Sequence, residues 1–384
     1  MRKLRPDFKT IADFRKDNRR AIKEVCGEFT LLCKKLELFG GELVAIDSSK
    51  FRASNSKKRN FNEAKLKRAL REIEEKVREY LAELDDNDKR EAGVKSPGAE
   101  EIKAKIEILR DRRGKYQGLL KELRASGESQ ISLTDPDSRV MLNNQRIEVC
   151  YNVQATVDDK HKLILDHEVT NEAKDQDQLS RMGRRAKEIL GVEGLEVLAD
   201  KGYYKAVEVK ECVDNGIIPY IPGRESRVPK DINVPRPEFY KDRFKYDGER
   251  DLYLCPSGRE LTFKNRARHH GKMMRLYQSK ECQGCQLRPQ CMRNKKGRII
   301  YRWEHEEVLE DMRQRVESNR DKVKMRQWLS EHPFGTIKRS MNQGYLLLRG
   351  LDKVAAEVSL TVLAYNIKRV INIVGLKAMI EALA

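Results

Sequence analysis

The sequence predicts an α/β fold: a mixed sheet flanked by helices, with a helical-hairpin insertion and a small cysteine-containing insertion. Two short apolar runs, 43–46 and 195–199, have the length and the Val/Leu content of buried strands. A third segment, 147–155, alternates apolar and polar residues with the period of two expected of a half-buried strand. Segments with helical spacing separate these strands, as they do in an α/β domain.

The order of the predicted elements narrows the fold class. A strand ending at Asp47 is followed, after the helical insertion, by a hairpin of two strands, a helix, a strand, a helix and a last strand. The corresponding ranges are 147–155, 163–169, 179–190, 195–199, 206–215 and 217–221. This is the order of an RNase H-like sheet, and we expect that domain over residues 43–224 and 301–374.

Two helical regions lie outside the predicted sheet. Residues 1–42 carry an irregular apolar face among many Arg and Lys residues, and we interpret them as the remnant of a helical N-terminal domain. Residues 58–125 contain two apolar seams spaced alternately by three and four, which predicts an antiparallel helical hairpin. The seams are Leu66, Leu70, Ile73, Val77, Tyr80 and Leu84, then Ile102, Ile106, Leu109, Tyr116, Leu120 and Leu123. A structural arm is the simplest interpretation, and a dimer contact or a DNA clamp remains open.

The charge balance points to a polyanionic partner. The 384 residues carry a formal net charge of +18, with a pI of about 9.4. Such a balance favours nucleic acid. Residues 1–18 lack the apolar region of a secretory signal, and the apolar segment 354–374 is interrupted by charges, so we expect a core helix there and no membrane partner. The expected location is the cytoplasm, in association with the nucleoid.

Four of the eight cysteines cluster in the predicted insertion 225–300. They are Cys255, Cys282, Cys285 and Cys291, and Cys282 and Cys285 have the C-x-x-C spacing of a metal knuckle. Four thiolates would form a closed structural zinc site. Cys255 has no close partner in the sequence, and His269 or His270 could replace one ligand. The alternative is a set of reduced cysteines packed in a small β domain.

Three acidic residues stand out as candidate catalytic groups. Asp47 and Asp200 each follow a predicted strand, and the carboxyl ends of strands are where such sheets place ligands. A single aspartate at the end of a strand is better interpreted as a helix cap or a turn residue, and the second copy of the pattern favours a shared site. Two carboxylates brought together are costly unless a cation lies between them. Glu331 precedes Lys338 with six residues between them, about two helical turns. It supplies the third carboxylate of a two-metal site.

The motifs around these acids resemble bacterial insertion-sequence transposases of the DDE class. The resemblance extends from about residue 6 to 372. It rests on IDSSK at Asp47, LADKGYYK at Asp200 and EHPFGTIKR at Glu331. The flanking segments 135–138, 151–154, 169–172, 348–351 and 364–368 also match. Members usually have a longer helical N-terminal domain, most of which this chain lacks.

The resemblance implies an RNase H-like catalytic domain with Asp47, Asp200 and Glu331 as its catalytic triad. It also implies two Mg²⁺ ions, or Mn²⁺, with Asp47 bridging the ions, Asp200 holding one and Glu331 the other. The implied reaction is hydrolysis at transposon ends, followed by attack of the freed 3′-hydroxyl on target DNA. Lys338 and Arg339 would hold phosphate oxygens of the double-stranded DNA, and two copies of the chain would assemble on it as a homodimer.

One part of the family's signature differs in this sequence. The positions of a Tyr and an Arg upstream of the catalytic Glu hold Lys324 and Gln327, and Arg326 lies one place off as a candidate DNA-binding residue. Two other functions remain open. One is a non-catalytic or truncated transposase-derived protein that only binds DNA. The other is an RNase H-like nuclease without strand transfer.

Overall fold

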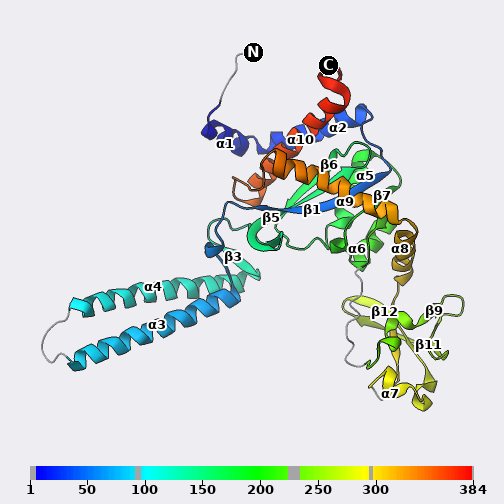
Figure 1. Ribbon diagram of the computed structural model, residues 1–384, viewed down its shortest axis with the longest axis horizontal. Helices are drawn as coiled ribbons and strands as arrows, with labels where there is room; N and C mark the ends of the chain where they lie inside the picture. Colours follow the sequence, from blue (N-terminus) through cyan, green and yellow to red (C-terminus); the bar gives the residue numbers. More distant parts are fainter. Residues whose placement is uncertain (1–5, 91–96, 224–233, 294–296, 383–384) are drawn as a thin grey trace.

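The computed structural model describes residues 6–90, 97–223, 234–293 and 297–382. Figure 1 shows a central sheet covered by helices, a long two-helix arm on one side and a small β module on another. The helices and the mixed sheet confirm the predicted α/β class. Within the described residues, every helix is too short or too polar to cross a membrane.

The central sheet has six strands. They are β1 (Leu43–Arg52), β4 (Arg139–Asn143), β5 (Arg146–Asp158), β6 (Ile164–Thr170), β7 (Leu195–Leu198) and β8 (Ile217–Tyr220). The order is β4-β5-β1-β7-β8, and β6 also pairs with β5. β1 is antiparallel to β5 and parallel to β7, and β7 is parallel to β8. The antiparallel strands β5 and β6, the central strand β1 and the parallel strands β7 and β8 form the arrangement of an RNase H-like sheet, as predicted, and β4 adds a sixth strand.

Helices cover both faces of this sheet, which changes the environment of β5. Helices α5 (Leu179–Leu190), α6 (Ala206–Asp214) and α8 (Glu306–Ser318) contribute to the core on one face. Helix α10 (Leu351–Glu381) packs on the other. The alternation in 147–155 predicted a half-buried strand, but β5 is buried continuously from Val149 to Asp158. The expectation is wrong because the polar residues of β5 face buried partners rather than water.

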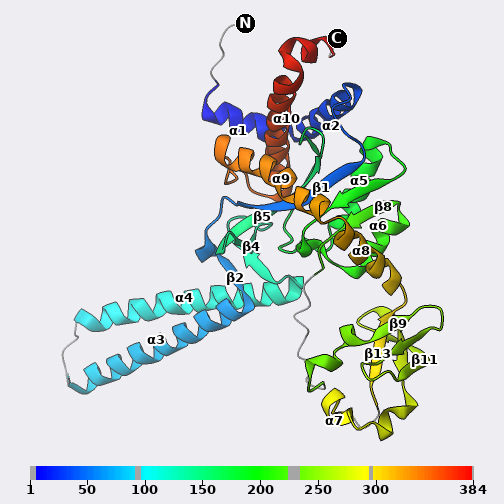
Figure 2. The ribbon, with the colours of Figure 1, turned by 45° about the vertical axis from the view of Figure 1, so that its right-hand side comes forward.

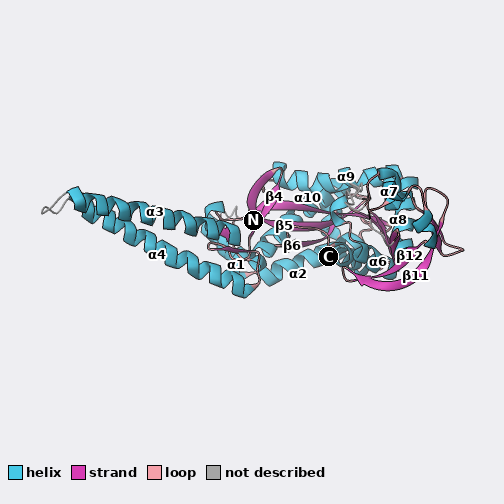
Figure 3. Cartoon of the chain, turned by 90° about the horizontal axis from the view of Figure 1, so that it is seen from below, coloured by secondary structure: helices cyan, strands magenta, loops and turns pink. Residues whose placement is uncertain are grey.

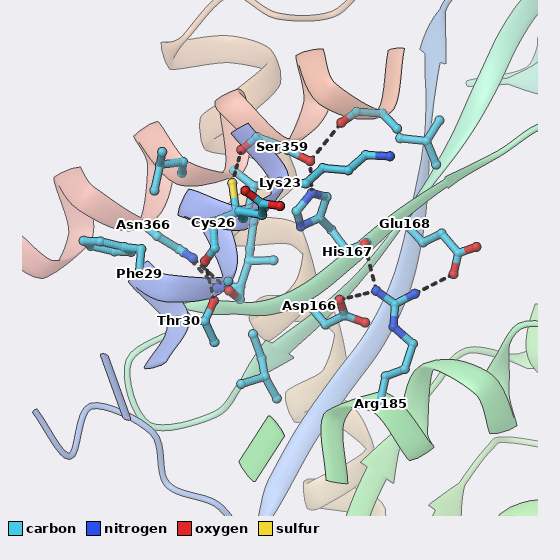
Figure 4. Close-up of a pocket in the computed structure, with 18 of the residues that line it drawn as sticks. Lys23, Cys26, Phe29, Thr30, Asp166, His167, Glu168, Arg185, Ser359 and Asn366 are labelled. Carbon is cyan, nitrogen blue, oxygen red and sulfur yellow. Dashed lines mark hydrogen bonds and ion pairs between the residues drawn. The ribbon is translucent and has the colours of Figure 1, made fainter. Parts of the chain in front are cut away.

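The N-terminal helices α1 (Phe8–Asp17) and α2 (Arg19–Lys35) pack against α10. A cavity of about 820 Å³ lies between α2, β6, α5 and α10, at the β6 edge of the sheet (Figure 4). Its wall includes His167, which is partly buried next to the Ser359 hydroxyl and whose pKa is lowered to about 4, chiefly by desolvation. Burial also raises the pKa of the neighbouring Asp166 to about 6. The cavity is two strands away from β1.

The arm consists of α3 (Glu63–Arg90) and α4 (Pro97–Ser126). At its root, the 3-10 turn Lys57–Arg59 leads into a two-stranded sheet of β2 (Asn60–Asn62) and β3 (Gln130–Ser132). Helix α3 continues past the predicted seam to Arg90, and the rest of the expected turn, 91–96, lies outside the described residues. Figures 2 and 3 show the arm projecting well away from the sheet.

The β module is a five-stranded antiparallel sheet with the order β13-β12-β11-β10-β9. Its strands are β9 (Lys245–Asp247), β10 (Leu252–Leu254), β11 (Glu260–His269), β12 (Lys272–Gln278) and β13 (Ile299–Trp303). Short helical turns, Pro237–Phe239, Lys241–Arg243, Lys280–Gly284 and Arg288–Cys291, complete it. Trp303 and Met274 pack against the core of the central sheet. Strand β13 spans the domain boundary expected at residue 300, and the boundary expected at 224 lies outside the described residues.

Candidate active site

The register of the sheet brings Asp47 and Asp200 to the same level on neighbouring strands. Ala45 of β1 pairs with Leu198 of parallel β7, and each acid comes two residues later. Adjacent strands are about 4.8 Å apart. Asp47 is largely buried, which raises the pKa of its carboxyl, and the negative charge of Asp200 raises that pKa further. The structure therefore brings these two predicted residues together.

The side chain of Asp47 is held from helix α9 (Arg320–Gly335). Its Oδ2 accepts hydrogen bonds from Arg326 Nη1 at 2.8 Å and Ser330 Oγ at 2.6 Å. Arg326 and Ser330 are four residues apart, so they share the helix face turned toward β1. Both contacts oppose the rise of the Asp47 pKa caused by burial. A positive charge thus already faces the candidate catalytic carboxylate.

Asp200 begins the turn that follows β7. Its Oδ1 accepts a hydrogen bond from Gly202 N at 2.7 Å, and it caps the 3-10 turn Lys201–Tyr203. The capping interpretation is therefore correct for one oxygen of Asp200. The side chain is only partly buried and lies beside Asp47. Asp200 can therefore cap the turn with one oxygen and still occupy a candidate catalytic position.

Glu331 follows Ser330 on α9, but its carboxylate takes part in a different contact. Gln327 Nε2 donates to Glu331 Oε1 at 3.0 Å, and Glu331 is exposed. One residue of helix turns a side chain by about 100°, so Glu331 does not share the face of Ser330. Across residues 6–90, 97–223, 234–293 and 297–382, no three His, Cys, Asp or Glu side chains are grouped so that they could hold a metal ion. Of the three predicted catalytic residues, Asp47 and Asp200 therefore lie together, and Glu331 lies on the neighbouring helix with its carboxylate in another contact.

The predicted DNA-binding residues lie around the same strand. Lys338 Nζ donates to the carbonyl of Lys50 at 2.7 Å and lies over the ring of Phe51, and burial lowers its pKa. Lys338 and Arg339 belong to the π-helical turn Thr336–Ser340, where Arg339 is exposed. Arg326 pairs with Asp47 in this structure.

A buried polar cluster next to the two aspartates was missed by the sequence interpretation. Asp175 accepts hydrogen bonds from Lys50, Asn152 and Gln154, and Tyr203 Oη donates to Gln154 Oε1. Burial raises the pKa of Tyr203 well above its usual value, and the charges of Asp175, Asp47 and Asp200 raise it further. Asp175 lies in the polar segment before α5, where an aspartate commonly caps a helix, but its side chain binds strands β1 and β5 instead. The signal in the sequence was the presence of two amide side chains, Asn152 and Gln154, within the otherwise apolar strand β5.

The four clustered cysteines line one cavity in the β module. Burial raises the pKa of Cys291 to about 11, and the charges of Cys282, Cys255 and Cys285 raise it too. All four thiols are free, and their positions do not form a coordinating group within the described part of the module. His269 instead lies at the end of β11 against Tyr301.

Residues 254–371 match the family model described as "Transposase DDE domain". The matched range includes the cysteine cluster, α9 with Glu331, and Lys338, while Asp47 and Asp200 precede it. No curated protein and no solved structure matches the chain.

Proposed function

We propose that this chain, whose residues 254–371 match the family model of a transposase DDE domain, cuts DNA at transposon ends and joins them to target DNA with divalent metal ions. The observation that carries the proposal is that Asp47 and Asp200 lie side by side where the parallel pairing of β1 with β7 ends. Asp200 directly follows β7, whereas β1 continues past Asp47 to Arg52, so the strand end expected at Asp47 is wrong. Two carboxylates side by side, one of them largely buried, repel each other unless one binds a proton or both bind a cation. The pair is therefore suited to a divalent metal.

The oxygen donors of Asp47 and Asp200 fit Mg²⁺, or Mn²⁺, both of which prefer carboxylates. Such ions neutralise the charges on the attacking and leaving oxygens of a phosphodiester. Glu331 would complete the set by leaving Gln327, since its long side chain starts one residue from Ser330. Arg326 neutralises Asp47 in the structure, and cation binding would release Arg326 to pair with a DNA phosphate.

Lys338 and Arg339 would position the scissile strand. Lys338 extends to the backbone of Lys50, three residues after Asp47 on β1. Arg339 is exposed on the same turn. Contacts from such side chains to phosphate fix the register of a duplex without reading its sequence. A homodimer assembled on two transposon ends is part of the same proposal.

A cleavage assay tests this function. We expect purified protein with Mg²⁺ or Mn²⁺ to nick duplexes that carry the ends of the element, leaving 3′-hydroxyls, and to join them to a target plasmid. A chelator should stop both reactions. Nicking without joining would indicate a simple nuclease. Binding without nicking in either metal would favour the alternative, a non-catalytic transposase-derived DNA-binding protein.

The cysteine cavity is proposed as a structural zinc site, since all four cysteines line it and Cys282 and Cys285 come from one short turn. We expect the full chain to hold one zinc ion, measured by mass spectrometry of the metal content. Cys282→Ser should lose that ion and lower the melting temperature, because structural zinc stabilises the fold that binds it. Cys26→Ser is the matched control, as Cys26 lies on α2 and its thiol contacts the Ser359 carbonyl. Zinc-free protein purified from zinc-supplemented medium would contradict the assignment.

A further inference from the structure

The arm is anchored firmly at its root. Lys65 Nζ donates to the carbonyls of Lys57, Lys58 and Asn60 at 3.1, 3.2 and 2.6 Å. A small apolar core of Phe61, Leu66, Leu119 and Leu123 closes the same end. The 28 residues of α3 extend the arm by about 42 Å. The root also contacts the central sheet, because Val140 N of β4 donates to Gln130 Oε1 of β3 at 2.8 Å.

Two ion pairs between the helices define one side of the arm, here called the Arg110 flank. They are Arg124 with Glu63 at 2.7 Å and Arg113 with Glu74 at 3.1 Å. At 100° per residue, further side chains share this side of α3 or α4. The basic members between 63 and 78 and between 110 and 124 are Lys67, Arg71, Arg78, Arg110, Arg113, Lys121 and Arg124. Only Glu63 and Glu74 oppose these seven charges, which leaves a net charge of +5.

Several cations of the Arg110 flank are available to a ligand. Arg71, Arg110 and Lys121 are exposed. In the part of the chain that the structure describes, none of these three forms an ion pair. Exposed arginine and lysine side chains without a protein partner are suited to phosphate oxygens. The flank thus presents positive charge along about 21 Å of α4, from Arg110 to Arg124, and Arg110 and Lys121 in this stretch form no ion pair within the described residues.

The charge changes along and around the arm. On the opposite side, here called the Lys115 flank, the same root half carries Lys65, Lys76, Arg112 and Lys115 against Glu72 and Glu122. Farther out, the ranges 79–86 and 100–109 hold seven acidic and two basic residues. A polyanion would be attracted to the root of the Arg110 flank and repelled from the outer half. This uneven distribution of charge along the arm indicates a particular binding surface, which the net charge of the whole chain does not.

From this distribution, we propose that the Arg110 flank binds the phosphate backbone of the duplex next to the cleavage site. The arm starts at Glu63, sixteen residues after Asp47, and the rest of β1, the turn Lys57–Arg59 and β2 join the two regions. A 21 Å contact corresponds to about six base pairs. Contacts to phosphates position a duplex and do not depend on its sequence. The inference rests on the proposed DNA-cutting function, because it assigns a surface to that same substrate.

Two triple variants with equal charge change test the inference. Arg71→Gln/Arg110→Gln/Lys121→Gln neutralises the Arg110 flank, and Lys76→Gln/Arg112→Gln/Lys115→Gln neutralises the Lys115 flank. All six side chains are exposed, so both proteins should keep the wild-type circular dichroism and melting temperature. The measurement is fluorescence anisotropy with a labelled duplex, without divalent metal, over a series of salt concentrations.

The Arg110-flank variant should bind at least tenfold more weakly at low salt. Its plot of log affinity against log salt should have a slope smaller by about 2 to 3, since each lost phosphate contact removes about 0.9. The Lys115-flank variant should stay within about threefold of wild type. Equal weakening of both variants, or of neither, would overturn the inference. Binding needs no cleavage, so an inactive wild type that still shows this difference would refute the catalytic proposal and leave the arm surface supported.

Discussion

Asp47→Asn should reduce metal-dependent cleavage by roughly 10³-fold or more while leaving DNA affinity unchanged or higher. The asparagine keeps the shape of the side chain but removes the charge that, with Asp200, would hold the metal. Such a loss corresponds to about 4 kcal/mol of transition-state stabilisation. DNA binding should not suffer, because Arg326 loses its counterion at 2.8 Å and becomes free for phosphate. Rates of nicking and duplex anisotropy measure the two effects separately.

A matched variant is available on the helix that contacts Asp47. Asp321 lies in the first turn of α9, is almost fully exposed and pairs only with Lys324 among the described residues. Asp321→Asn changes the formal charge by the same amount and should leave cleavage within about twofold of wild type, since surface ion pairs of this kind contribute little. An Asp47→Asn protein that still nicks end-containing DNA within tenfold of wild type would remove Asp47 from the catalytic set.

Local sequence patterns were sufficient to predict the individual strands and helices of the central sheet. The runs before Asp47 and Asp200 are apolar because β1 and β7 are buried at the centre of the sheet. Helix α5 runs from Leu179 to Leu190 as its spacing predicted. The order of these elements, together with the preference of sequential strands to pair, then leaves few possible topologies.

Long-range contacts were not predictable in the same way. Asp137 caps α10 through Leu351 N, in agreement with its position in a polar turn. Asp175 is in a similar local sequence but contacts Lys50, Asn152 and Gln154 from two strands. Nothing local distinguishes these two aspartates, because the difference arises from segments more than twenty residues apart in the chain. The orientation of a side chain such as Glu331 depends on its immediate neighbours, and a motif does not specify it.

Glu331→Gln should lower cleavage by roughly 10²- to 10³-fold and reduce the number of bound Mn²⁺ ions from two to one, as measured by titration calorimetry. The reason is that glutamine keeps the size of the side chain but is a much weaker ligand for a hard cation. Gln327→Ala provides the contrast, because it removes the hydrogen bond at 3.0 Å that holds Glu331 away from Asp47. This variant should retain both ions and bind them at least as tightly as wild type. If Glu331→Gln cuts DNA and binds two ions like the wild type, the third ligand must come from elsewhere, and the exposed position of Glu331 would represent its functional state.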